Sequence, residues 1–417
     1  MNSRFRSNFI KIAKANVLAQ LLPLLAAPLL ARLYTPDDFG ALALFSAVAS
    51  LLLAFSSWRF DWSVPNTSSE TLAAALLLFG AAALLLFSGV TFFVLWSWAE
   101  QWSFWKGFDV LGPLLLFLPV TILGGGFHQL MHCWYVRQAE LSKVASVRIA
   151  QSFTGTGLNV VGGYAGLGAW GLIGSSVISA WVGMGLLVSG AQSLKRSFAR
   201  LSLNRIKVGI TRYWWESTTS TMVAVVNVAS LAVVPLLLVQ YYSAKEVGWY
   251  ALMYRLAITP IGLLTSALSQ SFWAEAAQLV KTDIVRLKNL FLKSTKLLML
   301  AAIPAVLLCV SGPLFVGPVL GEDQWAGAGD ILMALAPMLV GMIVVQPLTH
   351  LIVHKKQIWK LYLDVIKLVA TVLLIILFSR AGGELHVLIF YLSLVFLVSH
   401  GILFYLNLIC LKKQLRL

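Results

Sequence analysis

Long runs of apolar residues, separated by short polar breaks, dominate the sequence. Leu72–Val94 and Val365–Phe378 are apolar almost throughout. In a hydrocarbon core about 30 Å thick, backbone polar groups are satisfied only inside helices of about 20 residues or in closed barrels. Barrel strands would alternate strictly over about ten residues, and these runs do not. The pattern predicts an all-α integral membrane protein.

Twelve membrane spans are predicted from the apolar runs. They lie near 10–33, 39–58, 71–98, 110–136, 143–165, 170–192, 213–242, 247–276, 294–316, 328–353, 358–379 and 386–410. The longest inner loop separates the first six spans from the last six. We therefore expect an N-terminal six-helix lobe at 1–192, a cytoplasmic linker at 193–212 and a C-terminal six-helix lobe at 213–417.

Basic residues lie almost entirely in alternate connections. Of the 31 Lys and Arg, the connections on the side opposite the termini hold only Arg32, Lys106, Lys245 and Arg380. Three more, Arg148, Arg255 and Lys367, fall within spans. Because loops rich in Lys and Arg stay on the inner side of a membrane, both termini are predicted to be cytoplasmic.

Composition agrees with a membrane protein and narrows the choice of partners. The chain is 59% hydrophobic and 11% charged, against about 25% charged in soluble domains, and its mean hydropathy is +0.85. The net charge of +15 is spread over short inner loops. Topology and the anionic headgroups of the phospholipid bilayer explain it better than nucleic-acid binding, so no nucleic acid is expected as a partner.

Metal and disulfide chemistry are not expected. The three cysteines, Cys133, Cys309 and Cys410, lie inside apolar runs without paired spacing. His128 and His132 have the i, i+4 spacing that can hold a metal, but no third ligand follows them, which favours packed or hydrogen-bonded histidines. The glycine-rich stretches lack the flanking pattern of a phosphate loop. No cofactor is therefore predicted.

A short segment is repeated in the two halves. Leu33–Leu44 joins the first two spans, and Tyr241–Leu252 joins the corresponding spans of the second half on the same face. The matching pairs are Tyr34/Tyr242, Asp38/Glu246, Gly40/Gly248, Ala43/Ala251 and Leu44/Leu252. A tight outer turn favours an acid and a Gly in any case, but a duplication would give two parallel lobes around a central cavity, an architecture typical of transporters.

Two motifs resemble a known family. The stretch Ala31–Gly40, ARLYTPDDFG, and the stretch Trp58–Pro65, WRFDWSVP, are similar to motifs of Wzx-type polysaccharide flippases, in the superfamily that also holds multidrug antiporters and the lipid II flippase. The second motif departs from the family pattern, because Phe60 replaces a Tyr and Trp62-Ser63 replaces aliphatic residues.

The resemblance implies a function and partners. An undecaprenyl-diphosphate-linked oligosaccharide would be moved from the cytoplasmic to the periplasmic leaflet of a bacterial inner membrane, for assembly of lipopolysaccharide O-antigen, capsule or exopolysaccharide. A polysaccharide polymerase and a chain-length regulator would be further partners, and transport would be coupled to H+ or Na+.

Cations within the spans are the first candidates for contact with a diphosphate, because isolated charges are expensive in hydrocarbon. Arg148 either faces the cavity or snorkels to the inner headgroups. Arg255 lies in a span where a cation is unexpected, near Pro260. Lys367 stands three residues after Asp364, so that the two form either an ion pair or a substrate contact with a gating or ion-coupling acid.

Three other acids and one arginine complete the candidates. Arg59 and Asp61 flank the inner end of the second span and are expected to pair as a gate, with Arg59 also a substrate contact. Glu216 and Glu275 are near the inner ends of spans seven and eight. Each either binds the coupling ion or is simply solvated, since burial would be needed to favour its protonated form.

Two other functions compete with the flippase. A membrane polysaccharide polymerase or ligase handles the same lipid-linked substrates, but the outer connections here are short and carry no catalytic constellation. A drug or cation antiporter of the same superfamily would require acids rather than bases in the cavity. The intraspan cations therefore favour a transporter of an anionic lipid rather than an enzyme.

Overall fold

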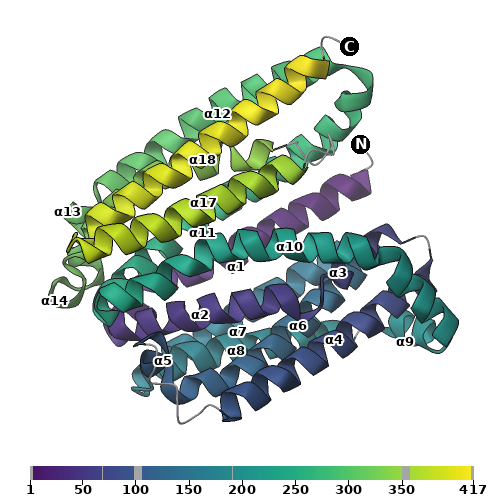
Figure 1. Cartoon of the computed structure of the whole chain (residues 1–417), viewed down its shortest axis with the longest axis horizontal. Coiled ribbons are helices and arrows are strands. Elements are labelled where there is room, and N and C mark those ends of the chain that lie inside the picture. The colour runs from purple at the N-terminus through teal and green to yellow at the C-terminus, as the bar shows by residue number, and fades with distance from the viewer. Residues whose placement is uncertain (1–2, 68, 98–105, 190, 350–356, 415–417) are drawn as a thin grey trace. The chain divides into compact units, whose positions relative to one another are not determined.

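The computed structural model describes residues 3–67, 69–97, 106–189, 191–349 and 357–414. The predicted span positions 98, 190 and 350–353 lie outside these ranges, as do Lys355, Lys356 and Arg416, which are among the cations of the predicted inner side. Over the described ranges the regular structure consists of helices alone (Figure 1). The all-α prediction is confirmed, and the chain is a multi-pass membrane protein.

The helices form two compact units. Unit 1 comprises 1–34 and 41–232, and unit 2 comprises 35–40 and 233–417. Unit 1 begins with α1 (Ser3–Leu33), α2 (Pro36–Ser56), whose residues up to Gly40 belong to unit 2, α3 (Phe60–Ser63), the 3-10 turn η1 (Val64–Asn66) and α4 (Glu70–Ser97). They are followed by α5 (Lys106–Leu111), η3 (Gly112–Leu116), α6 (Phe117–Arg137), α7 (Leu141–Tyr164), α8 (Ala169–Ser189) and α9 (Gln192–Phe198).

The long helix α10 (Leu203–Tyr241) begins in unit 1 and ends in unit 2. Unit 2 continues with α11 (Ala244–Thr282), α12 (Ile284–Val310), α13 (Gly312–Leu320), α14 (Glu322–Trp325), α15 (Ala328–Ala334), α16 (Ala336–Val344), η4 (Gln346–Leu348), α17 (Gln357–Arg380) and α18 (Leu385–Gln414). The stretch 193–212, expected as a linker, thus holds most of α9 and the start of α10.

Membrane-crossing helices account for most of the predicted spans. In the described part of the chain, eight helices are long and apolar enough to cross a bilayer. α15 and the segment Ala336–Leu348 pass the same test together but are bent by 42°, so they form either a broken ninth span or a re-entrant loop. Every predicted range coincides with one or more of the helices above. The total of twelve spans and the side on which each terminus lies stay predictions.

Within unit 1, α7 packs between α1 and α8, and α6 packs against α4 and α8. A buried core joins α4 and α6 around the fully enclosed side chains of Phe60, Leu84 and Trp134. Within unit 2, α16 packs against α12 and α18, and α17 packs against α18. Each unit therefore has its own core.

The repeated turns adopt the same local structure. Thr35 Oγ1 accepts a hydrogen bond from the Asp38 backbone N–H, and Asp38 Oδ2 accepts one from the Thr35 N–H. Ser243 and Glu246 form the same reciprocal pair at the start of α11. Such capping boxes satisfy backbone N–H groups that have no partner inside a helix, so the repeated acids start α2 and α11 in the same way.

The repeated tyrosines are also used alike. The Tyr34 hydroxyl donates to the Asn159 carbonyl oxygen at 2.6 Å, close to the connection between α7 and α8. The Tyr242 hydroxyl donates to the Gly383 carbonyl oxygen at 2.8 Å, in the connection between α17 and α18. In each half, the tyrosine after the first long helix thus holds the hairpin of the last two helices, which supports the duplication inferred from the sequence.

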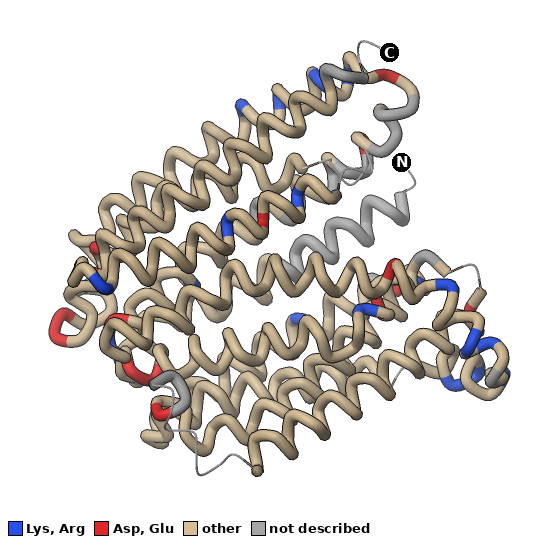
Figure 2. The backbone as a smooth tube through the Cα atoms, in the orientation of Figure 1, with Lys and Arg blue, Asp and Glu red and all other residues tan. Residues whose placement is uncertain are grey.

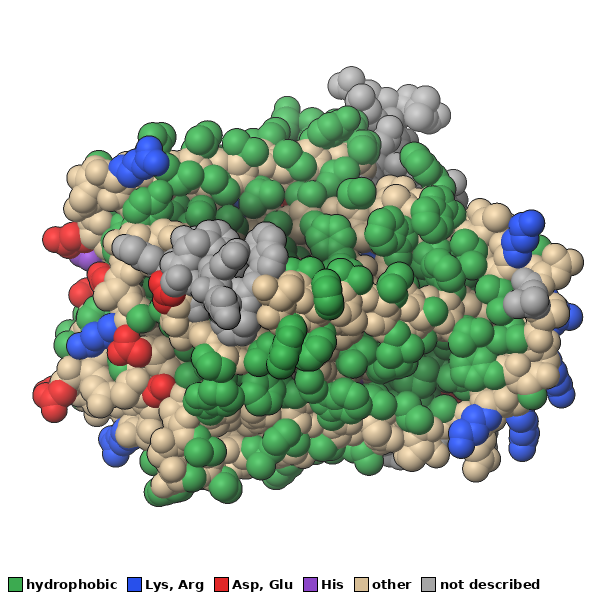
Figure 3. Space-filling model, turned by 60° about the horizontal axis from the view of Figure 1, so that its bottom comes forward, with side chains coloured by type: hydrophobic (Ala, Val, Ile, Leu, Met, Phe, Trp, Pro, Cys, Tyr) green, Lys and Arg blue, Asp and Glu red, His purple; other side chains and the backbone are tan. Residues whose placement is uncertain are grey.

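Charged and apolar side chains are separated along the helices. Figure 2 shows that in unit 1 the Lys and Arg gather where α9 lies and α10 begins, while acidic positions lie near α5 at the other end. On the face shown in Figure 3, hydrophobic side chains cover the middle of the helices and charges lie at their ends. A membrane-embedded surface has this distribution.

Candidate functional site

The second motif of the sequence forms a break between α2 and α3. Trp58 and Arg59 both have left-handed backbones, with φ of 49° and 50°. This conformation is disfavoured for residues with a Cβ, by about 1–2 kcal/mol each, so the surrounding contacts have to hold it. The break turns the chain so that α3 and η1 pack against α4 and α6.

Asp61 is the buried centre of this break. Its side chain is 1% exposed. Oδ1 accepts a hydrogen bond from Ser57 Oγ at 2.9 Å, and Oδ2 accepts one from Gln129 Nε2 of α6 at 2.9 Å. The Cys133 thiol donates to the same Oδ2 at 3.7 Å. Asp61 therefore ties the break to α6.

Arg59 does not pair with Asp61 within 4 Å in the structure. Its guanidinium lies over the ring of Trp62, 5.2 Å from the ring centroid, and its buried Nε has no hydrogen-bond partner. Asp61 instead uses neutral donors on its own turn and on α6. The expected gate between these two residues thus has no ion pair in this conformation, and Arg59 keeps its charge available to another anion.

Arg137 clamps the end of the break. Its Nη1 donates to the carbonyl oxygens of Val64 at 3.1 Å and Thr67 at 2.6 Å. Those carbonyls belong to η1 and its C-cap, where the helix has ended and the oxygens need external donors. Arg137 thus has a structural role.

Aromatic side chains surround the break on the α10 side. Trp58 Nε1 donates to Thr218 Oγ1 at 3.0 Å, and the Trp58 and Trp214 rings stack at 6.0 Å between centroids. Trp62 is 55% exposed. Trp214 is 46% exposed as well, so two accessible indole rings lie at the break, and one of them, Trp62, contacts the Arg59 guanidinium.

Arg148 lies on the exposed side of α7. Its charge acts on the imidazoles of His128 and His132 on α6, whose ring centroids are 6.4 Å apart. Over the part of the chain that the structure describes, no cluster of three or more His, Cys, Asp or Glu could hold a metal ion.

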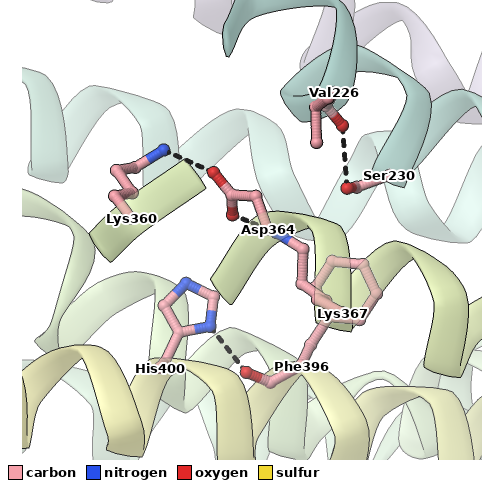
Figure 4. A network of polar contacts seen from close by, with 7 residues as sticks. All are labelled: Val226, Ser230, Lys360, Asp364, Lys367, Phe396 and His400. Carbon is pink, nitrogen blue, oxygen red and sulfur yellow. Dashed lines mark hydrogen bonds and ion pairs between the residues drawn. The ribbon is translucent and has the colours of Figure 1, made fainter. Parts of the chain in front are cut away.

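Lys367 and Asp364 form the ion pair that was one of the two sequence-based alternatives, and a second lysine joins them. Asp364 Oδ1 accepts from Lys367 Nζ at 3.0 Å, and Oδ2 accepts from Lys360 Nζ at 2.8 Å (Figure 4). The Lys367 ammonium also lies 5.2 Å from the centroid of the Phe396 ring of α18. The three charged residues lie on one face of α17.

The remaining candidates are accessible and separate from this cluster. Arg255 lies on α11, 11 residues and so about 16 Å from its start, and its side chain is exposed. Glu216 on α10 and Glu275 on α11 are exposed too. In the described residues none of the three takes part in an ion pair.

Sequence reasoning missed several residues of these sites. Gln129 and Ser57 donate hydrogen bonds to Asp61. The only sequence signal for Gln129 was that a Gln is rare inside an apolar run, and Ser57 had none. Lys360 is four residues before Asp364 on the same helical face, so its partnership was readable from the spacing. His400, which contacts the Phe396 carbonyl oxygen from α18, gave no sequence signal.

The chain matches a model of one protein family over most of its length. The family is described as "Polysaccharide biosynthesis protein", and the match covers residues 29–329. It includes both motifs on which the family resemblance was based, which is thereby confirmed. No curated protein sequence shows a significant match to the chain.

Solved transporter structures share the fold. A multidrug resistance MATE family transporter of the MOP superfamily, in an inward-facing conformation, has a TM-score of 0.68 at 12% identity and covers 98% of this chain and 99% of its own. The lipid II flippase MurJ, in an inward closed conformation, has a TM-score of 0.72 at 11% identity, with 97% and 90% covered. A MOP superfamily transporter from Pyrococcus furiosus has a TM-score of 0.63 at 12% identity, with 98% and 96% covered.

At such low identities these similarities establish the fold alone, and the family match adds the lineage. The chain belongs to the polysaccharide biosynthesis protein family and has the fold of the MOP superfamily transporters.

Proposed function

We propose that the protein is a flippase that moves an undecaprenyl-diphosphate-linked oligosaccharide from the cytoplasmic to the periplasmic leaflet of a bacterial inner membrane. The lipid tail stays in the bilayer while the diphosphate and the sugars pass along a hydrated pathway in the protein. The product then serves assembly of a surface polysaccharide, either O-antigen, capsule or exopolysaccharide, with a polymerase and a chain-length regulator as downstream partners.

The observation that carries this proposal is a set of cations inside the long helices or at the inner end of one. Arg59 has no hydrogen-bond or ion-pair partner among the described residues, and Arg255 is exposed about 16 Å along α11. Arg148 and Lys367 lie inside α7 and α17, about 10 and 15 Å from the starts of these helices. Because an exposed cation is costly against lipid, these positions favour a pathway that accepts an anion.

The same cations separate this proposal from drug export. A pathway for a hydrophobic cation would be lined by acids, whereas Asp61 is buried and Asp364 is neutralised by two lysines. The polarity of the intraspan charges therefore favours an anionic lipid substrate over a cationic drug.

Alternating access follows from the architecture that we propose. Twelve spans with cytoplasmic termini form two parallel lobes, and the capping boxes at the starts of α2 and α11 support the duplication behind them. Rocking of one lobe against the other would open the pathway to each side in turn. We propose H+ or Na+ as the coupling ion, with Glu216, Glu275 or Asp364 as a carboxylate that binds it.

Deletion of the gene tests the function. We expect loss of full-length surface polysaccharide and accumulation of lipid-linked repeat units whose sugars remain in the cytoplasmic leaflet, detected by mass spectrometry after labelling from the periplasmic side. Re-expression of the intact chain should restore export. Repeat units that accumulate in the periplasmic leaflet would instead indicate a polymerase or ligase, and unchanged polysaccharide would contradict the proposal.

A further inference from the structure

Three charged side chains on α17 form a bridge in which one carboxylate holds two ammonium groups. Lys360 Nζ is 2.8 Å from Asp364 Oδ2, and Lys367 Nζ is 3.0 Å from Asp364 Oδ1 (Figure 4). With all three side chains ionised, the positive charges exceed the negative ones. Asp364 therefore pairs both lysines without neutralising them fully.

In this bridge, the Asp364 carboxylate contacts the two lysines as the oxygens of a diphosphate would. Each lysine contacts a different oxygen of the same anionic group, and a diphosphate also presents several charged oxygens to separate donors. A purely structural role explains the cluster poorly, because a buried ion pair gains little over apolar side chains of similar volume. The two lysines thus form a site for an oxyanion that Asp364 occupies.

Exposure is graded along the bridge. The Lys360 side chain is 30% exposed, whereas those of Lys367 and Asp364 are 10% and 8% exposed. Lys360 is close to the beginning of α17 at Gln357, and Lys367 is two turns further, about 10 Å along the helix. An anion that arrives at the start of α17 reaches Lys360 first and Lys367 second.

We infer that Asp364 is an internal substitute for the diphosphate of the transported lipid, which displaces it from Lys360 and Lys367. This inference rests on the proposed function and adds how substrate binding and ion coupling are linked. A carboxylate released from both ammonium groups loses their compensating charge, which is costly at this depth. One Asp364 oxygen therefore takes up a proton from solvent, forming an O–H bond, and returns it when the lipid leaves and the lysines pair with Asp364 again.

Among the described residues, His400 is a further titratable group that faces the bridge. It lies on α18, which packs against α17, and the charges of Lys360, Asp364 and Lys367 all act on its ring. Its Nδ1 is 2.7 Å from the Phe396 carbonyl oxygen, which fixes the ring orientation. His400 is thus the competing acceptor for the proton, and the experiment has to separate the two.

Binding of farnesyl diphosphate to the full-length protein in nanodiscs tests the exchange. Calorimetry in buffers of different ionisation enthalpy measures affinity and proton uptake together. We expect the unaltered chain to take up about one proton per ligand. Asp364→Asn should abolish the uptake and bind roughly tenfold more tightly, if the lysines are free in about a tenth of the unaltered molecules.

Matched variants identify the lysines as the site. Lys360→Gln and Lys367→Gln should each weaken the binding of farnesyl diphosphate. Lys245→Gln is the control: it removes the same charge from a residue that lies over the Trp249 ring on α11, and it should leave the binding unchanged. Inorganic diphosphate should compete with farnesyl diphosphate, whereas vesicles of phosphatidylglycerol should not. Competition by the vesicles alone would mean that the site holds a phospholipid headgroup and would overturn the exchange.

A charge-free variant guards against misfolding. The combination Lys360→Gln, Asp364→Asn and Lys367→Gln removes all three charges of the bridge together and should melt like the unaltered chain while losing both binding and proton uptake. Unchanged or weaker binding in folded Asp364→Asn overturns the exchange, as does proton uptake that persists in Asp364→Asn and disappears in His400→Gln. If export in the deletion strain is normal, the proposed function fails independently of these binding results.

Discussion

Gly40 and Gly248 each lie against the backbone of the other's turn. A Cβ on Gly40 would stand 2.6 Å from the Ala244 carbonyl oxygen, and one on Gly248 would overlap the Pro36 carbonyl oxygen. The starts of α2 and α11 therefore meet reciprocally, as expected when two copies of one segment are related by an approximate twofold axis. Glycine at both positions allows this approach.

Gly248→Ala should destabilise the protein by about 1–3 kcal/mol, because the added methyl meets backbone rather than a flexible side chain. The check is the midpoint of thermal unfolding in detergent. Gly185→Ala is the matched control, since a Cβ there meets nothing within 4 Å. Equal midpoints for both variants would show that the two turns do not approach each other as described.

Arg59→Gln and Asp61→Asn should separate transport from folding. Arg59 has no hydrogen-bond or ion-pair partner in the described chain, so its loss should reduce export while the free energy of unfolding changes by at most about 0.5 kcal/mol. Asp61→Asn places an amide next to the hydrogen-bond donors of Ser57 and Gln129. It should lower the free energy of unfolding by about 1–3 kcal/mol. Membrane abundance and surface polysaccharide are measured side by side, and equal loss of abundance in both variants would refute the distinction.

Arg137→Lys should loosen the segment after the helix break. The Arg137 guanidinium donates to both the Val64 and Thr67 carbonyl oxygens, and a single ammonium replaces it. One buried acceptor therefore loses its charged donor, which should lower the free energy of unfolding by about 1–3 kcal/mol. Limited proteolysis in detergent should then cut between η1 and α4 more rapidly. Arg200→Lys is the control, because that side chain is exposed. Unchanged cleavage would argue against the clamp.

The orientation of the chain is testable by cysteine labelling. In a background without Cys133, Cys309 and Cys410, Glu322→Cys should react with an impermeant maleimide added outside intact spheroplasts. Arg200→Cys should react only after the membrane is permeabilised. Both side chains are exposed, so accessibility within the protein does not confuse the result, and the reverse pattern would invert the predicted topology.

Regular features of the fold were predictable because the bilayer imposes them. Apolar runs located the long helices, and the repeated acid and glycine located the turns that start α2 and α11. The extension of α10 through 203–212 was not predictable, because its first turns carry the Lys and Arg that indicate an inner loop. The bend between α15 and α16 was likewise hidden inside one apolar run.

The candidate site was predictable in its residues more than in its contacts. Arg59 and Asp61 were singled out from the sequence as charged residues beside a span, and their spacing suggested an ion pair. The left-handed backbone at Trp58 and Arg59 separates the two charges, and no propensity of Trp or Arg favours that conformation. Asp61 then depends on Gln129, a contact between distant segments that one sequence does not reveal.

Transport by the purified protein tests the flippase proposal most directly. Proteoliposomes are prepared with a labelled undecaprenyl-diphosphate-linked oligosaccharide in both leaflets, and an impermeant glycosidase is added outside. We expect cleavage to proceed beyond the outer-leaflet pool in vesicles that hold the unaltered chain, and to stop at that pool in empty vesicles and with the Arg59→Gln variant. Cleavage that stops at the outer-leaflet pool in every preparation would contradict the proposed function.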